Sequence, residues 1–243
     1  MAVRTTTLLL CAFALSVTSS ILLSILLLVR LQAILPPYRN APQKRRRGSP
    51  THLMVVLGSG GHTAEMLEML RDLDPSAYNR RSWIVSAGDS MSAIKAEKFE
   101  KMLEALARDT RPHQEYRTYT ITTLPRARKI HQSLLTTPVS ALYCLLACLR
   151  LLYNNKYGYP DLIVTNGPAT GCILVFASVL LRFFDAKKAH TDGKMRTIYV
   201  ESWARVKRLS LTGWLLQLVV DRLGVQWKEL KGGRAEYMGW LVL

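Results

Sequence analysis

The pattern of apolar and polar positions begins with one long apolar run near the N-terminus. Residues 5–29 contain no charged side chain, and Leu, Ile, Val, Ala and Phe dominate. A helix of this length spans a hydrocarbon core of about 30 Å. A secretory signal peptide is the alternative, but its apolar region usually has about 7 to 15 residues and ends at a small-residue cleavage site, which is not evident here. The run predicts an uncleaved transmembrane anchor over residues 5–29.

Charge is distributed unevenly around this run. One basic residue precedes it, whereas several follow: Arg4 against Arg30, Arg39, Lys44, Arg45, Arg46 and Arg47. By the positive-inside rule, residues 1–4 face the lumen and the rest of the chain faces the cytosol. Four prolines between residues 35 and 50 indicate that residues 30–50 form a basic, non-helical linker.

After residue 50, short apolar runs alternate with segments of helical periodicity. The predicted strands are 52–57, 83–87, 116–121, 162–165, 197–201 and 224–227. The predicted helices are 63–71, 90–107, 130–153, 169–184 and 211–220. Such alternation favours parallel pairing through right-handed crossovers. Residues 51–243 are therefore predicted to form one α/β domain with a doubly wound, Rossmann-like parallel sheet.

Two of the predicted helices are apolar nearly all round and have a competing interpretation as further membrane spans. They cover residues 134–152 and 172–184. The first contains Pro138, and the second has about 13 residues before Asp185, which is short for a span. Buried crossover helices, or helices that press an apolar face onto the bilayer, fit better.

The net charge of +16 is compatible with two classes of partner, nucleic acid and an anionic membrane surface. Part of the excess lies directly after the apolar run, where it resembles a juxtamembrane cluster, and no zinc-finger, basic-zipper or RNA-binding signature is present. We therefore expect membrane lipids and not nucleic acid. The cysteines are in apolar runs without a CxxC pair, so we expect reduced, buried thiols and no metal: Cys11, Cys144, Cys148 and Cys172.

A glycine-rich loop joins the first predicted strand to the first predicted helix. Its residues are Gly58, Ser59, Gly60, Gly61, His62 and Thr63. Glycines let backbone N–H groups approach a ligand closely, and a helix N-terminus attracts anions, so a phosphate or diphosphate fits here. The loop is neither a Walker A motif nor a GxGxxG fingerprint, and an ordinary tight turn is the alternative. His62 is a candidate general base or phosphate donor, or only a cap.

Polar residues also follow two later strands. Asn166, Gly167 and Thr170 follow the fourth strand and offer hydrogen bonds to a sugar or phosphate, although Asn-Gly-Pro is also ordinary turn chemistry. Glu201 ends the fifth strand as a candidate base or sugar ligand, and Arg205 can neutralise phosphate or lie on a basic surface. Because no Ser-His-Asp set, metal cluster or carboxylate pair is evident, a self-sufficient hydrolase is not expected.

The combination of GSGGHTAEML, TNGP, YVESWARVKRLSLTG, DRLGVQW and RAEYMGWLV resembles a known family. It is similar to the membrane-anchor subunit of the two-component UDP-N-acetylglucosamine transferase of dolichol-linked oligosaccharide assembly. The resemblance implies the N-terminal, acceptor-binding half of a GT-B glycosyltransferase, similar to that of the bacterial peptidoglycan GlcNAc transferase. It also implies a soluble donor-binding partner subunit, which this chain recruits to the cytosolic face of the endoplasmic reticulum, whose membrane is continuous with the nuclear envelope.

Together the two subunits are expected to act as an inverting transferase that adds the second GlcNAc to dolichyl-diphosphate-GlcNAc, with neither cofactor nor metal, and this chain is not expected to be active alone. On this resemblance, His62 is the base and Glu201 the second choice. The implied diphosphate site comprises Gly58, Ser59, Gly60, Gly61, Thr63, Asn166, Gly167, Thr170 and Arg205. The resemblance also implies a partner interface, for which an ordinary packed edge is the alternative. Its residues are Tyr237, Trp240, Leu241, Val242 and Leu243. The alternative is a pure membrane scaffold without catalytic residues.

The chain departs from the family pattern at two places. Gly-Thr-Cys is expected directly after Pro168, but the chain has Ala169, Thr170, Gly171 and Cys172. An aromatic residue is commoner after Arg222, where Leu223 stands. We expect the first departure to change the backbone geometry after the fourth strand and the second to loosen the contact made after the fifth helix.

Overall fold

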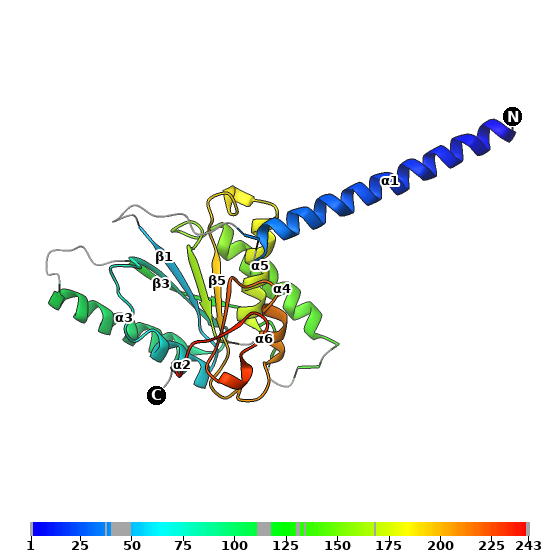
Figure 1. The fold of residues 1–243 in the computed structure, drawn as a ribbon. Helices are drawn as coiled ribbons and strands as arrows, with labels where there is room; N and C mark the ends of the chain where they lie inside the picture. Colours follow the sequence, from blue (N-terminus) through cyan, green and yellow to red (C-terminus); the bar gives the residue numbers. More distant parts are fainter. Residues whose placement is uncertain are drawn as a thin grey trace.

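The computed structural model describes residues 2–36, 38–39, 50–110, 118–129, 132–133, 135–167 and 169–241. One long helix, α1 (Ala2–Ile34), projects from an α/β domain (Figure 1). Within the described residues, 12–34 is the one helical stretch long and apolar enough to cross a membrane, with a mean hydropathy of 2.4, and only its C-terminal end, at Ile34, is buried against the domain. A single N-terminal apolar helix is therefore confirmed.

The domain is built on one parallel sheet of seven strands. They are β1 (His52–Val56), β2 (Arg80–Ser86), β3 (Thr118–Leu124), β4 (Leu162–Thr165), β5 (Arg196–Val200), β6 (Arg222–Val225) and β7 (Ala235–Tyr237). Their order is β3-β2-β1-β4-β5-β6-β7, and every pair is parallel. The chain winds one way from β1 to β3 and the other way from β4 onward. The predicted doubly wound α/β fold is therefore confirmed, with its switch point between β1 and β4.

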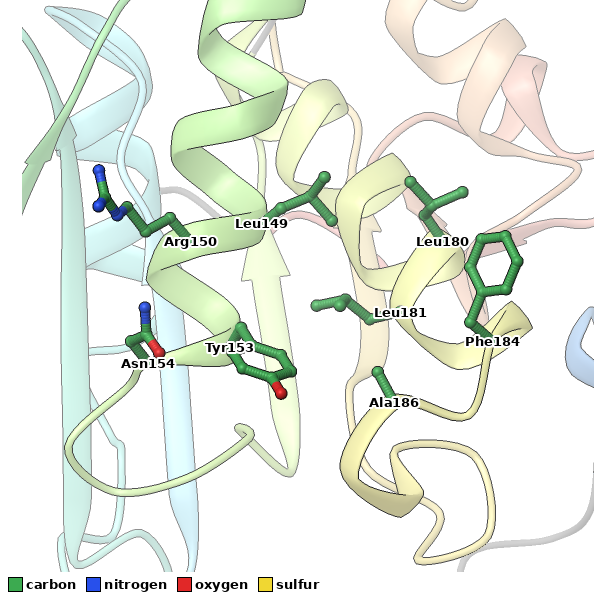
Figure 2. Close-up of a pocket in the computed structure, with 8 residues that line it drawn as sticks. All are labelled: Leu149, Arg150, Tyr153, Asn154, Leu180, Leu181, Phe184 and Ala186. Carbon is green, nitrogen blue, oxygen red and sulfur yellow. The ribbon is translucent and has the colours of Figure 1, made fainter.

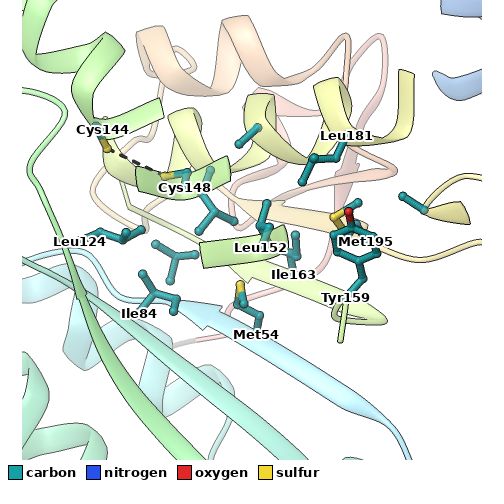
Figure 3. Packing of buried hydrophobic residues seen from close by; sticks show 14 of the residues in the cluster. Met54, Ile84, Leu124, Cys144, Cys148, Leu152, Tyr159, Ile163, Leu181 and Met195 are labelled. Atoms are coloured by element: carbon teal, nitrogen blue, oxygen red, sulfur yellow. Dashed lines mark hydrogen bonds between the residues drawn. The ribbon is translucent and has the colours of Figure 1, made fainter. Parts of the chain in front are cut away.

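Helices cover both faces of this sheet. They are α2 (Gly61–Met69), α3 (Ser90–Thr110), α4 (Thr137–Tyr153), α5 (Thr170–Phe183) and α6 (Leu211–Leu216), with short 3₁₀ turns η1 (Ala186–Lys188) and η2 (Lys228–Leu230). Alternate residues of β1 face opposite layers, as a pleated strand requires. Leu53 and Val55 pack against α2 and α3, whereas Met54 packs under α4 and α5. Figure 3 shows that second layer.

Several predicted boundaries were wrong by a few residues. β2 begins at Arg80, three residues before the predicted start. The apolar pattern missed this part of the strand because it contains Arg81, which forms a buried ion pair with Nη2 2.7 Å from Glu100 Oε2. β3 ends at Leu124, three residues after the predicted end, and its predicted start at residue 116 lies outside the described residues. α4 begins at Thr137 instead of residue 130, because Pro138 occupies its first turn. α2 begins at Gly61, two residues early, and α6 ends at Leu216, four residues early.

The last strand was assigned to the wrong residues. β6 spans Arg222–Val225, two residues earlier than predicted, and β7 had no predicted counterpart. β7 has three residues, and Glu236 in its centre is exposed and pairs with Arg222. A strand so short and polar carries no apolar periodicity that a sequence pattern would detect.

The two apolar helices are part of the domain. α5 contributes buried residues to two core clusters, Leu174 and Leu181 on one side and Val175 on the other. α4 buries Cys144, Cys148 and Leu152 but exposes its opposite side. At 17 and 14 residues, both are shorter than a membrane span requires. Both are crossover helices, as expected, and the domain cysteines Cys144, Cys148 and Cys172 are buried free thiols; the side chain of Cys11 is outside the described set.

Candidate functional site

Three strand-end loops meet at the carboxyl edge of the sheet. β4 lies directly beside β1, and β5 lies beside β4, so the loops that follow these strands are neighbours. This edge is where parallel α/β sheets bind ligands. The glycine loop, the Asn166 turn and the Glu201 segment are therefore brought together, as their positions after strands predicted.

Two glycines allow the first two loops to touch. A side-chain carbon on Gly167 would lie 2.9 Å from the Cα of Gly58, and one on Gly58 would lie 2.6 Å from the Cβ of His62. Both distances are below any contact that a real Cβ makes. Gly60 has φ +63°, a conformation that favours glycine. These glycines therefore set the shape of the loop at the start of α2.

Thr63 stabilises the loop from inside and does not face outward. Its side chain is fully buried and donates to the carbonyl of Gly58, and its Oγ1 lies 2.6 Å from the Oγ of Ser92 at the start of α3. Thr170 is also buried, and its Oγ1 accepts hydrogen bonds from Ser86 and from the backbone of Ala127. The structure gives both threonines internal partners.

Glu65 joins all three loops, and the sequence analysis missed it. Its Oε1 accepts from the backbone N of Trp203 at 2.7 Å and from Ser202 at 3.2 Å, and its Oε2 accepts from Asn166 Nδ2 at 3.3 Å. Asn166 Nδ2 also donates to the carbonyl of His62 at 2.8 Å. The available signal was its place three residues after His62, which puts both side chains on one face of α2.

The charge of Glu65 is favoured by these donors. Burial alone raises the pKa of its carboxyl, but the nearby ring of His62 and hydrogen bonds from the Trp203 backbone and from Ser202 outweigh that effect and lower the pKa below its ordinary value. A carboxylate is therefore fixed beside His62. This arrangement resembles the acid that orients a catalytic histidine in general-base sites.

His62 is the partly exposed member of the site. Its side chain is 31% exposed, and its Nδ1 lies 3.5 Å from Oε2 of Glu65. Nδ1 lies on the side of the carboxylate but has no hydrogen-bond partner among the described residues, and Nε2 is the ring nitrogen left for a ligand. The position fits a general base beside a carboxylate.

Glu201 is engaged in holding the next helix. It is 1% exposed, and its Oε2 accepts from the backbone N of Ser210 at 2.9 Å and from the Ser210 hydroxyl at 3.1 Å. Ser210 is the N-cap of α6 and accepts from Gly213 N. A Cβ at Gly213 would lie 2.2 Å from Oε2 of Glu201, so the glycine admits the carboxylate. The geometry gives Glu201 a structural environment, whereas that of His62 is open.

The remaining predicted residues surround this centre. Ser59 and Gly61 are exposed on the glycine loop, and Arg205 is exposed on the loop after β5. Ala169, where the family pattern has glycine, adopts φ 52° and ψ −82°. That positive φ suits glycine, so the departure noted in the sequence places an alanine in a backbone turn that favours glycine. Pro168 is outside the described residues.

An open groove of about 1020 Å³ begins at the same edge of the sheet. It lies between the loops after β2 and β3 and the first turns of α4, and its lining combines basic and apolar side chains. Arg126 and Lys129 are on one side, and Val139 and Tyr143 of α4 are on the other. A groove of this kind accommodates an amphiphile with an anionic group.

The predicted partner-docking segment is partly integrated into the sheet. Tyr237 lies in β7 and packs on the core formed by α5, α6 and β6, whereas Trp240 is 62% exposed. The rings of Trp203, Trp227 and Trp240 form a continuous group, with centroids 5.5 and 5.9 Å apart. Leu241 is half-buried and donates to Gln226, and Val242 and Leu243 lie outside the described residues.

The described residues contain no candidate metal site. No group of three or more His, Cys, Asp or Glu side chains with the arrangement of a metal site occurs among the residues that the structure describes.

A family model described as Alg14-like oligosaccharide biosynthesis protein matches residues 53–241. The chain belongs to the Alg14 family. Relatives named UDP-N-acetylglucosamine transferase subunit Alg14 include that of Schizosaccharomyces pombe, 38% identical over 204 residues, 83% of this chain and 89% of the relative. That of Yarrowia lipolytica is 41% identical over 221 residues, 90% of this chain and 94% of the relative. Among solved structures, Acinetobacter baumannii MurG has a TM-score of 0.47 at 17% identity, covering 77% of this chain and 44% of that chain.

The Alg14 family match has clear limits along the chain. It starts at residue 53, within β1, and ends at residue 241, so it contains the sheet and every loop of the site. α1 and the linker precede it. The Alg14 match therefore concerns the α/β domain, and α1 lies outside it.

Proposed function

We propose that this chain is the acceptor-binding subunit of a heteromeric, inverting UDP-N-acetylglucosamine transferase. A separate, soluble subunit binds UDP-GlcNAc, and the pair adds the second GlcNAc to dolichyl-diphosphate-GlcNAc. α1 crosses the endoplasmic reticulum membrane once, with residues 1–4 in the lumen and residues 51–243 in the cytosol. Membership of the Alg14 family and the names of its relatives support this role. The observation that carries it is an open histidine next to a carboxylate, beside a glycine loop.

The glycine loop is suited to the acceptor diphosphate. Backbone N–H groups at the start of α2 point out of the carboxyl edge of the sheet, and the helix dipole favours an anion there. Asn166 and Gly167 hold this loop in place from β4, and exposed Arg205 adds a positive charge on the loop after β5. The loop therefore binds the diphosphate through backbone groups, with side chains from the two neighbouring strands around it.

His62 removes a proton from the acceptor sugar in this proposal. Its Nε2 accepts the proton of the attacking hydroxyl, while Glu65 stabilises the imidazolium that forms. The hydroxyl oxygen then bonds to the anomeric carbon of the donor GlcNAc as the bond from that carbon to UDP breaks. UDP leaves, and one displacement inverts the configuration. Glu201, buried and bonded to Ser210, supports the loop instead of taking the proton.

The lipid must reach this edge although α1 meets the domain at the other end. Arg30 of α1 donates to the carbonyls of Arg182 and Phe183 at the end of α5, whereas the glycine loop lies at the start of α5. The 14 residues of α5 separate the two by about 20 Å. α4 runs between the same two ends and exposes Val139, Leu142, Tyr143 and Leu146 at helical spacing. This apolar stripe lies on the bilayer and places the groove of Arg126 and Lys129 within reach of a lipid.

The test is GlcNAc transfer from UDP-GlcNAc to a dolichyl-diphosphate-GlcNAc analogue, catalysed by membranes that contain the chain, with and without cytosol that supplies the soluble subunit. Transfer that requires cytosol, and that falls about 100-fold or more in His62→Ala, supports the proposal. Glu68→Ala, on the exposed side of the same helix, is the matched control. Transfer without cytosol would overturn the two-subunit division.

A pure scaffold is the second candidate, favoured by the exposed Trp203 and Trp240 with the half-buried Trp227 between them, a surface suited to a protein partner. In that case all chemistry belongs to the soluble subunit. His62→Ala would then assemble with its partner and keep nearly full transfer activity. Co-purification measured beside transfer separates the two functions.

A further inference from the structure

A second group of charged side chains lies at the amino edge of the sheet, opposite the glycine loop. Arg39 follows α1, Arg182 is near the end of α5, and Arg196 begins β5. All three surround Asp221, which precedes β6. Its carboxylate is 2.8 Å from Arg39 Nη1, 2.9 Å from Arg196 Nη1 and 3.9 Å from Arg182 Nη1. Four segments far apart in sequence therefore converge on one carboxylate.

Several donors in this cluster have no acceptor among the described residues. Arg182 is fully buried, and neither of its terminal nitrogens, Nη1 and Nη2, makes a hydrogen bond. Arg39 Nε and His190 Nδ1 are also buried and unbonded. A buried donor without an acceptor costs about 1–3 kcal/mol, and more when it is charged. Native structures rarely leave such groups together unless a ligand or water meets them.

The charges are unequal as well. Three guanidinium groups share Asp221, whose oxygens also accept from the backbone and hydroxyl of Thr197. The neighbouring carboxylates are occupied, Asp161 by Lys194 at 2.6 Å and Asp185 by the loop at Thr191. Burial lowers the pKa of Arg182 to about 9, Arg39 and Arg196 act in the same direction, and Asp221 opposes them. Among the described residues, the cluster therefore has more positive than negative charge.

We propose that Arg39, Arg182 and Arg196 bind the phosphate group of an anionic ligand at the amino edge of the sheet. Guanidinium groups match phosphate oxygens in geometry and charge. One phosphate supplies acceptors for the unbonded nitrogens of Arg182 and balances the excess positive charge. The site is separate from the glycine loop, since the length of α5 lies between them, and it does not depend on the proposed transfer reaction.

Two sources carry this chemistry, a phospholipid headgroup and free phosphate. α1 meets the domain beside α5 (Figure 1). Arg30 of α1 donates to the carbonyls of Arg182 and Phe183, so the cluster lies where α1 joins the domain. An apolar groove of about 400 Å³ lies between the same ends of α4 and α5, with Leu149, Leu180 and Phe184 around it (Figure 2). A phospholipid whose headgroup binds at the cluster can place an acyl chain in this apolar groove, whereas free phosphate requires the cluster alone.

The experiment uses the full chain in nanodiscs and measures its thermal unfolding midpoint. One arm adds inorganic phosphate to neutral phosphatidylcholine nanodiscs at constant ionic strength. The other replaces part of the phosphatidylcholine with phosphatidic acid and adds no phosphate. A ligand that binds the folded state raises the midpoint. Stabilisation in the second arm alone identifies the headgroup, and stabilisation by inorganic phosphate identifies a free-phosphate site.

Variants connect the response to the cluster. We expect Arg182→Met to weaken the effective binding constant at least about tenfold. Lys188→Gln, which removes one exposed positive charge from the same end of the domain, keeps the wild-type response. If Arg182→Met does not fold, Arg39→Gln takes its place in the same assay. The proposal is overturned if neither arm stabilises the wild type, or if the cluster variant responds as strongly as Lys188→Gln.

Discussion

The carboxylate of Glu65 connects the loops after β1, β4 and β5. Its contacts are with backbone and side-chain donors of Trp203, Ser202 and Asn166, and with the ring of His62. Removing a charged acceptor from such donors leaves them partly unbonded in a mostly buried place. The chemistry of the site and the stability of its loops therefore depend on the same group.

We predict that Glu65→Gln lowers the free energy of unfolding at pH 7 by about 1–2 kcal/mol, because hydrogen bonds to a charged acceptor are replaced by neutral ones. The pKa of Glu65 is lowered in the folded state, so its contribution is present above the ordinary value of 4.5 and is lost as the pH falls through the folded-state pKa. Wild type and variant should thus converge in acid. Urea unfolding across this pH range measures both curves.

Glu68→Gln is the control for that experiment. Glu68 is on the same helix but pairs with Arg71 on the surface, at 2.7 Å. An exposed pair contributes roughly 0–1 kcal/mol, so this variant should follow the wild-type curve. A constant difference between Glu65→Gln and wild type at all pH values would show that the charge of Glu65 contributes nothing.

Ala169 leads to a prediction of the opposite sign. Its φ of 52° and ψ of −82° are unfavourable for a residue with a Cβ. We expect Ala169→Gly to raise the free energy of unfolding by about 1 kcal/mol, since relief of strain exceeds the added entropy of the unfolded chain. Ala177→Gly, in the buried interior of α5, should destabilise instead. A lower unfolding midpoint for Ala169→Gly would contradict this account.

Sequence patterns identified part of this site for a physical reason. Glycines and His62 stand out because strand, turn and helix signals bracket them. Glu65 does not, because a glutamate on a short amphipathic helix is typical of a solvent-exposed position, and its partners are about 100 and 140 residues away. The burial of Glu201 beside Gly213 was equally invisible, since it depends on how α6 folds back over β5.

At the scale of elements, patterning predicted long, regular pieces well. β1 and β4 are continuous apolar runs because both of their faces are covered, and α2 to α5 follow in the expected order. The errors occur where polar residues lie inside a strand, as Arg81 does in β2, or where pairing alone defines a strand, as in β7. Tertiary partners such as Glu100 decide these positions, and they are remote in sequence.

The exposed stripe of α4 is the element whose role can be tested directly. We predict that Leu142→Gln with Leu146→Gln raises the KM for the lipid acceptor about tenfold, because each leucine loses about 1.5–3 kcal/mol of apolar burial on the bilayer, of which part is recovered by neighbours. The double variant should fold, since both side chains are more than half exposed. Transfer to lipid-linked acceptor, titrated in vesicles, measures the change.

Leu106→Gln provides the matched substitution on the other side of the sheet, where α3 exposes a leucine. It should leave the KM for the lipid acceptor unchanged. A water-soluble acceptor with a short chain should also be insensitive to the α4 variants, because it does not require the bilayer. Equal effects on long and short acceptors would place the α4 stripe inside the protein assembly instead of on the membrane.

At the scale of the whole molecule, the domain presents different chemistry at its two ends. The amino edge holds the anchor and the arginine cluster around Asp221, and the carboxyl edge holds the glycine loop, His62 and the tryptophans. Trp227 Nε1 donates to the carbonyl of Trp203, and the backbone N of Trp203 donates to Glu65. The aromatic surface is therefore connected through two hydrogen bonds to the carboxylate beside the proposed base.

This continuity predicts how a soluble subunit docks. Large exposed aromatic side chains beside a site are typical of protein interfaces, where a buried tryptophan often contributes 2 kcal/mol or more, roughly a 30-fold change in affinity. We predict that Trp240→Ala weakens association with the soluble subunit by about that factor and reduces transfer in proportion. Co-purification of the soluble subunit with the membrane-bound chain, followed across a range of its concentration, measures the affinity.

Trp214→Ala is the control, because Trp214 is 58% exposed on α6 and is not a member of the tryptophan group. Excess soluble subunit should restore transfer by Trp240→Ala, since the variant keeps His62 and the glycine loop, whereas no excess should restore transfer by His62→Ala. The two variants therefore separate assembly from chemistry. Normal association of Trp240→Ala, or equal loss in Trp214→Ala, would place the partner on another face and leave the tryptophans to stack against the acceptor sugar.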